Sequence, residues 1–390
     1  MRTPPALRVA VLAVIAVIAV AGASGAAAQP PGEPPARPRL RAQADLNDWE
    51  AYYDYGASML AVRNFGAARA GFYWAARLDP MRADPLYGWW VTNWLRDTRK
   101  WERYLRDDER VVSDPEVRRA DSVRMRALVR NPFVHQGIIM VLFEALPGRW
   151  GNDLATQAWI AYARPDFQKA AQLFGAAVAR DPRRYGYMRQ MRAASFVALQ
   201  RYDSALAELT TLRSELEQRE REHLVSPLES REMLEYAIAR LHFARGDVAA
   251  ARSALETAIV ENVGFPPAHE LLGEIALAQR DTATAVRELG TAVELDPGDA
   301  MFRVRYAIAL RAARRPAEAV EQLRHAARAE PFYADIQFHL GASLEAAGDR
   351  AAAARAYEEY IARAPARDAA DIARARQRLA ALAVTAASPE

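Results

Sequence analysis

The sequence predicts an all-α fold, an α-solenoid of stacked antiparallel helix pairs, and two observations support this. Three prolines, Pro297, Pro331 and Pro365, recur at a constant spacing of 34, and the segments before them repeat one order of large and small side chains. A fixed period of roughly 20–50 residues is typical of supersecondary units that bury their apolar faces only by stacking. Helical periodicity also runs from Leu46 almost to the end of the chain, and no convincing period-two strand interrupts it.

The composition fits a folded chain and excludes several classes of chemistry. Of 390 residues, 51% are apolar, and the formal net charge is only +3. Arg2 and Arg8 lie in a segment that we expect to be removed, so the mature chain is near neutral and lacks the basic surface that nucleic acids require. The sequence contains no cysteine, which excludes disulfides, thiolate metal sites, covalently attached haem and a bacterial lipid anchor.

Residues 1–28 have the three-part form of a secretory signal peptide. Arg2 and Arg8 flank the start, an apolar run covers residues 9–23, and Ala26-Ala27-Ala28 forms an A-x-A cleavage site. We therefore expect export to the periplasm or cell envelope, with cleavage after Ala28. An uncleaved N-terminal membrane anchor is the alternative, although the run is shorter than the roughly 20 residues of a membrane span. Residues 29–44 follow as a Pro-rich, extended tether without a core of its own.

Beyond the tether, one order of residues recurs in units of 34. Residues 49–82 and 151–184 both show large and small residues in helical spacing and a closing proline (Tyr52, Gly56, Ala68, Phe72, Ala75 and Pro80; Leu154, Ala158, Ala170, Phe174, Ala177 and Pro182). This pattern resembles the tetratricopeptide repeat (TPR) family, in which two antiparallel helices pack through small residues. The resemblance implies a TPR superhelix with aromatic-rich, partly degenerate repeats over 45–182, a TPR array over 183–365, and a C-terminal capping helix and tail over 366–390.

Two regions depart from the period. Residues 83–150 match it poorly, and the spacing of 115 between Pro182 and Pro297 is three repeats plus 13. The excess falls around residues 212–231, where the pattern predicts that a helix continues through a charged stretch. Ser226-Pro227-Leu228-Glu229 then forms a capping box, which predicts the start of a new helix.

No catalytic or metal-binding motif stands out. The six histidines are scattered without metal-ligand spacing, and neither a Gly-rich phosphate loop nor a G-x-S-x-G elbow occurs. We therefore predict no catalytic residues, no metal and no cofactor, and a protein that is not an enzyme. An activity whose residues escape motif analysis is the alternative.

Aromatic and apolar residues are unevenly distributed. All eight tryptophans lie before residue 160, where they either fill the cores of imperfect repeats or line an aromatic groove for a peptide or glycan. Residues 133–146 are an almost continuous apolar run, too short to span a bilayer. That run is either a helix buried on all sides or a contact with an oligomer partner or membrane surface.

The TPR resemblance also implies which side chains line the concave groove. They come from the first helix of successive units: Trp159 and Tyr162; Tyr236, Arg240 and Phe243; Glu270 and Glu274; Met301, Val304 and Ile308; Asp335 and Phe338. The Lys, Arg and Asn clamp by which some members of the family hold a C-terminal carboxylate is absent at these positions. An apolar strip with an acidic rim suits an amphipathic or basic-flanked protein segment. Alternatively, several of these side chains pack between helices.

Together these expectations describe an exported protein-binding scaffold or adaptor that acts in periplasmic or cell-envelope complex assembly. The expected partner is a protein or peptide segment. Nucleic acid is not expected, and a membrane only if the N-terminal segment stays uncleaved. A cell-wall glycan bound by the aromatic N-terminal repeats is the alternative.

Overall fold

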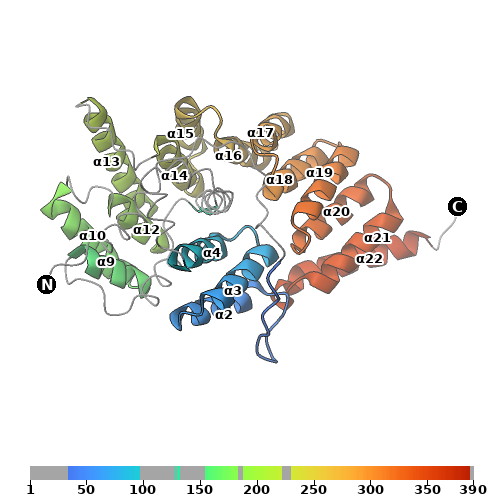
Figure 1. The fold of residues 1–390 in the computed structure, drawn as a ribbon. Coiled ribbons are helices and arrows are strands. Elements are labelled where there is room, and N and C mark those ends of the chain that lie inside the picture. The colour runs from blue at the N-terminus through green and yellow to red at the C-terminus, as the bar shows by residue number, and fades with distance from the viewer. Residues whose placement is uncertain are drawn as a thin grey trace, which may run out of the picture. The chain divides into compact units, whose positions relative to one another are not determined.

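The computed structural model describes residues 34–96, 127, 130, 131, 154–182, 188–221 and 230–386. Among these residues every regular element is helical, with 16 α-helices and one 3-10 helix (Figure 1). The prediction of an all-α fold is therefore confirmed. The expected signal peptide, the apolar run at 133–146 and the capping box at 226–229 lie outside the described residues. Within the described ranges, no helix is both long enough and apolar enough to cross a membrane.

The helices follow one another along the chain with short connections. In order they are α2 (Trp49–Ala61), α3 (Phe65–Leu78), α4 (Ala83–Arg96), α9 (Leu154–Ala163), α10 (Phe167–Arg180), α12 (Met188–Ala198), α13 (Tyr202–Arg221), α14 (Arg231–Ala244), α15 (Val248–Glu261), α16 (Pro266–Ala278), α17 (Thr282–Leu295), α18 (Ala300–Ala312), α19 (Pro316–Ala329), α20 (Asp335–Ala346), α21 (Arg350–Arg363), the 3-10 helix η1 (Ala366–Asp368) and α22 (Ala369–Ala386).

Four antiparallel pairs repeat one plan: α14–α15, α16–α17, α18–α19 and α20–α21 (Figure 1). Each pair joins two helices of 12 to 14 residues through a turn of three. The 34-residue period therefore corresponds to one helix pair and its connections, as the sequence predicts.

The turn inside each pair has its own periodic chemistry. Three of the four second helices begin with an aspartate whose side chain accepts a hydrogen bond from the backbone N–H three residues on: Asp247, Asp281 and Asp349. In α19 the cap position is Arg315, which makes no side-chain cap, and Pro316 starts the helix instead. The residue before the cap has positive φ at Gly246, Arg280, Arg314 and Gly348.

Small residues allow the two helices of a pair to approach closely. A Cβ added at Gly56 or Gly341 would lie 3.0 Å from Phe72 or 2.9 Å from Tyr357. One added at Gly273 would overlap Leu289 in the same way. These are the small and large positions of the repeat pattern, so the predicted packing register is correct.

The additional residues between Pro182 and Pro297 lengthen α13. This helix has 20 residues, and two of its glutamates pair with α12: Glu208 with Arg189 at 3.1 Å and with Arg192 at 2.7 Å, and Glu215 with Arg189 at 2.8 Å. The continuation of this helix through a charged stretch is confirmed. The next described helix, α14, begins at Arg231 and takes Ser230 as its N-cap.

The helices form two compact units, each assembled from separate stretches of the chain. The first contains the described parts of residues 59–65 and 86–265. The second contains the described parts of residues 25–58, 66–85 and 266–390. Most of the first repeat, residues 49–58 of α2 and 66–78 of α3, therefore belongs to the same unit as α16 to α22, while residues 59–65 at the tip of the α2–α3 hairpin belong to the first unit.

The described part of the tether also packs on this hairpin. The Arg37 guanidinium lies 5.1 Å from the ring centres of both Tyr52 and Trp74, and its Nε donates a 2.8 Å hydrogen bond to the Tyr52 hydroxyl. The indole N–H of Trp74 donates to the Pro35 carbonyl at 2.9 Å. Burying both rings under a cation and a proline backbone fixes the entry to α2.

Candidate functional site

The three groove positions predicted on α18 belong to an apolar core cluster of the second unit. Met301 is 2% exposed and Val304 7% exposed, while Ile308 is half-buried at the edge of the cluster. Met81, in the turn between α3 and α4, packs against the same cluster. An apolar side chain just after the first hairpin therefore packs against the cluster that contains Met301 and Val304.

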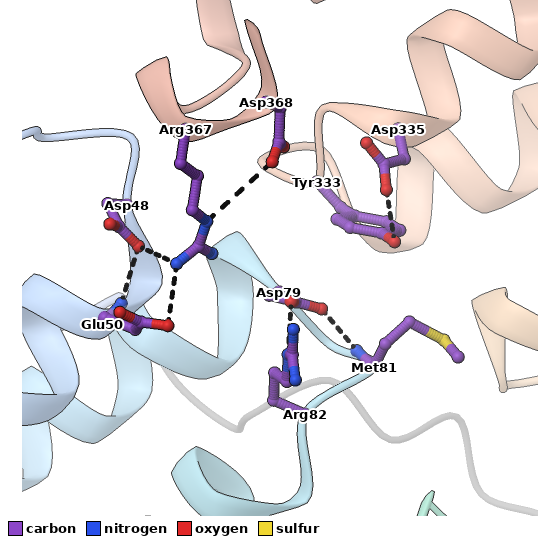
Figure 2. Close-up of polar contacts among 9 residues, drawn as sticks. All are labelled: Asp48, Glu50, Asp79, Met81, Arg82, Tyr333, Asp335, Arg367 and Asp368. Carbon is purple, nitrogen blue, oxygen red and sulfur yellow. Dashed lines mark hydrogen bonds and ion pairs between the residues drawn. The ribbon is translucent and has the colours of Figure 1, made fainter. Parts of the chain in front are cut away.

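The predicted positions on α20 are also engaged. Asp335 accepts a 2.8 Å hydrogen bond from the Tyr333 hydroxyl (Figure 2). Phe338 meets Tyr357 and Tyr360 edge-on, with ring centres 5.9 and 5.2 Å away. Arg374 of α22 lies 5.8 Å from the centre of the Phe338 ring. The last helix thus covers one face of Phe338.

The acidic rim on α16 is neutralised by an arginine that sequence reasoning missed. Arg305 of α18 places its Nε 2.5 Å from Glu270 Oε1, and its Nη1 pairs with Glu274. Glu270 is 5% exposed, so its charge is paired inside the protein and not displayed on a rim. The signal was in the sequence, because Arg305 lies one repeat plus one residue after Glu270.

In the first unit, the predicted aromatic positions pack within and beside their own helices. Trp159 and Tyr162 meet the ring of Phe174 edge-on at 5.4 and 6.5 Å. Tyr236 is 1% exposed and accepts a 3.2 Å hydrogen bond from Arg240, and Phe243 is half-buried. The other tryptophans whose side chains the structure describes are at most 8% exposed: Trp49, Trp74, Trp89 and Trp90.

The second unit contains a contact that the repeat pattern does not predict. We call it the hairpin contact: residues 45–50 and 74–82 lie against residues 329–335 and 362–368. Its buried half centres on Arg77, whose Nη1 lies 2.7 Å from Glu330 Oε2, with side chains 7% and 9% exposed. Arg77 also donates to the Ala329 carbonyl at 3.2 Å. Removing one charge of a buried pair of this kind is strongly destabilising, because the other charge is left buried and unpaired.

Aromatic rings enclose that ion pair. The rings of Trp74 and Phe332 meet edge-on with centres 5.0 Å apart, and the Arg77 guanidinium lies 5.7 Å from the Phe332 ring centre. Edge-to-face rings and a stacked guanidinium both add attraction beyond the area they bury. The buried half therefore combines a buried ion pair with the aromatic rings of Trp74 and Phe332.

The outer half of the hairpin contact is held by exposed charges (Figure 2). Arg367 Nη1 lies 2.8 Å from Asp48 Oδ1 and 3.0 Å from Glu50 Oε1. The Ala366 N–H donates to Asp45 at 2.8 Å, and the Asn47 amide donates to the Ala362 carbonyl at 3.3 Å. Such exposed interactions are individually weak.

Carboxylates accumulate where the two sides meet. Asp79 accepts a hydrogen bond from the Met81 N–H and pairs with Arg82 (Figure 2). Its negative charge also repels the charged forms of Asp335 and Asp368. Burial is the largest effect on Asp335 and raises its pKa above the usual value. The hydrogen bond from Tyr333 lowers this pKa, and the Asp79 charge raises it further. Burial likewise raises the pKa of Asp368, with Arg367 opposing it. Deprotonation of these groups therefore opposes the contact.

Across the described ranges, no three His, Asp or Glu side chains are placed to hold a metal ion. The hairpin contact itself combines a buried carboxylate, an aromatic ring and an apolar cluster, and the planar cation of Arg77 suits the first two.

Comparison with known sequences identifies the repeats. Residues 236–300 and 305–368 match the profile of the family described as tetratricopeptide repeat. These residues contain the helix pairs α14–α15 to α20–α21 apart from the first residues of α14 and residues 301–304 of α18, so the match falls on the segments where the sequence pattern is most regular. Repeats of this family mediate protein–protein interactions, and the fold is typically non-catalytic. No curated protein sequence matches the chain significantly.

Several solved structures are similar at low identity. The C-terminal part of a TPR repeat-containing protein from Cytophaga hutchinsonii is 14% identical, covering 58% of this chain and 94% of that one with a TM-score of 0.44. YrrB, titled a TPR protein with an unusual peptide-binding site, is 18% identical over 53% of this chain and 100% of its own, with a TM-score of 0.40. MamA is 18% identical over 45% and 94%, with a TM-score of 0.35. The assignment rests on the family profile and on the helix pairs.

Proposed function

Since residues 236–300 and 305–368 match the tetratricopeptide repeat family, we propose that this protein is an exported adaptor that holds a protein segment on its repeat surface. The observation that carries the proposal is the run of helix pairs itself. In the second unit the pairs α16–α17, α18–α19 and α20–α21 pack one after another. We assign its place of action to the periplasm or cell envelope, in the assembly of protein complexes.

The partner that suits this surface is amphipathic and carries basic residues. Ile308 and Phe338, both half-buried, supply apolar area, and burying such area stabilises a complex. Glu330 is a carboxylate of the same unit and is paired with Arg77. A basic group on the partner therefore pairs with Glu330 only by taking the place of Arg77.

Purification of partners from an envelope extract tests this assignment. The full chain is compared with Ile308→Glu and Phe338→Glu, because both side chains are half-buried on first helices. Val260→Glu is a matched control, since Val260 is 80% exposed on a second helix. We expect the first two variants to lose partners that the wild type and the control retain. Retention of every partner by both variants, with unchanged helix content, would contradict the groove assignment.

Export is tested separately. Fractionation and intact-mass measurement of the native protein should give a soluble envelope form that begins at Gln29. A full-length mass in the membrane pellet would instead support the N-terminal anchor. A full-length mass in the cytoplasm would contradict export.

A further inference from the structure

We propose that the α2–α3 hairpin is a releasable occupant of the last repeats, and that their external partner is a protein segment with the same three side chains. These are an aromatic ring, an arginine three residues later and an apolar side chain four further on, as in Trp74, Arg77 and Met81. The inference rests on the proposed function and names the chemistry of its partner.

The first argument is where the hairpin lies. Glu330 and Phe332 lie at the connection from α19 to α20, and the residues that bind them come from a repeat about 250 positions earlier. In a repeat array each repeat packs against its neighbours in sequence. Nothing in that arrangement requires the first repeat to pack against the last ones. The hairpin therefore covers surface that the repeats α18–α21 do not themselves fill.

The second argument is the chemistry of that surface. The Glu330 side chain is 9% exposed when paired with Arg77. A buried carboxylate without a cation is strongly unfavourable, so any segment that replaces the hairpin must bring one. Arginine fits best, because its planar group can pair with Glu330 and lie over Phe332 at the same time. Met81 shows that an apolar side chain then reaches the α18 cluster.

The third argument is that the hairpin can leave. Residues 45–85 and 266–368 are joined along the chain only through residues 86–265, so no short connection keeps the hairpin in place. The outer half of the contact consists of hydrogen bonds and ion pairs that are partly open to solvent, such as Arg367 with Asp48, and solvent and salt weaken such pairs. The tethered hairpin therefore competes for this surface with a limited effective concentration, and a partner segment that binds tightly enough can displace it.

A crossed charge-swap experiment on the full chain tests both parts. The variants are Arg77→Glu, Glu330→Arg and the double swap. Docking of the hairpin is measured with Asn47→Cys/Ala362→Cys and a short bismaleimide, because the natural chain has no cysteine and these two residues are hydrogen-bonded. The surface is probed with labelled peptides of residues 70–85, one with the natural sequence and one with Arg77→Glu.

The proposal expects a specific pattern of results. The single swaps cross-link at least threefold less than the wild type, and the double swap recovers. The Arg77→Glu chain binds the natural peptide at least tenfold more tightly than the wild-type chain, whereas the Glu330→Arg chain prefers the altered peptide. Unchanged far-UV helix content in the single swaps, and recovery in the double swap, separates release from unfolding.

Two outcomes would overturn the proposal. Full cross-linking of both single swaps would mean that the hairpin is not released. Released hairpins without the crossed peptide preference would mean that the surface does not recognise this chemistry. Neither outcome would contradict the proposed function, which is tested separately by whether Ile308→Glu and Phe338→Glu lose envelope partners.

Discussion

The guanidinium of Arg77 lies 2.7 Å from the carboxylate of Glu330, and both side chains are more than nine-tenths buried. The two residues come from the first repeat and from the last repeats of the chain. This pair therefore fixes a contact that repeat periodicity cannot generate.

Breaking that pair from one side should destabilise the second unit. Arg77→Met removes the cation that pairs with Glu330, so we expect a loss of up to about 3–5 kcal/mol in the free energy of unfolding, the full value applying if the hairpin stays docked over the unpaired charge. Arg77→Met combined with Glu330→Leu should cost much less, because both charges are gone. Urea unfolding of the three variants measures the difference. As a control, Arg315→Met removes an exposed pair with Glu318 and should leave the midpoint unchanged.

A second prediction concerns pH at the hairpin contact. Asp335 faces Tyr333, Asp79, Asp368 and Tyr360, and its folded-state pKa is raised from the ordinary 3.8. Its contribution to stability is therefore complete below pH 3.8 and is lost as the pH rises through the raised value. At pH 7, Asp335→Asn should raise the melting temperature, and this gain should vanish as the pH falls towards 3.8.

At Glu288 the pKa is shifted in the opposite direction to that of Asp335, so the expected pH dependence is reversed. Its pKa is lowered, chiefly by the hydrogen bond with His269, whose Nδ1 lies 2.9 Å from Glu288 Oε2. This stabilisation is present above the ordinary pKa of 4.5 and is lost as the pH falls through the lowered value. Glu288→Gln should therefore lower the melting temperature at pH 7 and cease to matter in acid. Parallel pH profiles for the two variants would contradict both assignments.

The close approach of α2 and α3 predicts a strong effect at one glycine. A Cβ at Gly71 would lie 2.7 Å from the Gly56 backbone, which cannot rotate away. We expect Gly71→Ala to cost about 1–3 kcal/mol. At Gly290 the nearest atom to an added Cβ is 3.6 Å away, so Gly290→Ala should stabilise its helix by up to about 1 kcal/mol. Thermal melts of the two variants, which carry the same chemical change, should shift in opposite directions.

The turns inside the pairs predict a further difference. Arg280 has a φ of 62°, where Gly348 in the equivalent turn has 87°. Glycine adopts this region without the steric penalty of a side chain. Arg280→Gly should therefore stabilise the protein by up to about 1 kcal/mol, while Gly348→Arg should cost about as much. Arg324→Gly, at an exposed position inside α19, should instead destabilise, and the three melting temperatures measured together check the assignment.

Much of the fold could be predicted because its contacts are local and periodic. Gly273 meets Leu289, and Gly341 meets Tyr357, in each case across the two helices of one pair, so each repeat carries its own packing pattern. The extended α13 was predictable for the same reason, since the extra residues disturb the period at one place.

The candidate site was less predictable because its contacts are distant and its residues look ordinary. In the sequence, Arg77 and Glu330 are charges at the ends of second helices, which would usually face solvent. Only the fold shows that they meet and that Met81 reaches the α18 cluster. Arg305 was overlooked for a similar reason, because its role depends on two glutamates in the preceding pair.

Hydrogen–deuterium exchange of the full-length protein tests the central claim, the docking of the first repeat on the last, most directly. Peptides covering residues 74–82 and 329–335 should exchange slowly in the wild type, faster in Arg77→Glu, and slowly again when Glu330→Arg is added. Exchange in α16–α17 should stay unchanged throughout, because that pair lies outside the hairpin contact. Rapid exchange of both contact segments in the wild type, or equal protection in all three proteins, would contradict the account.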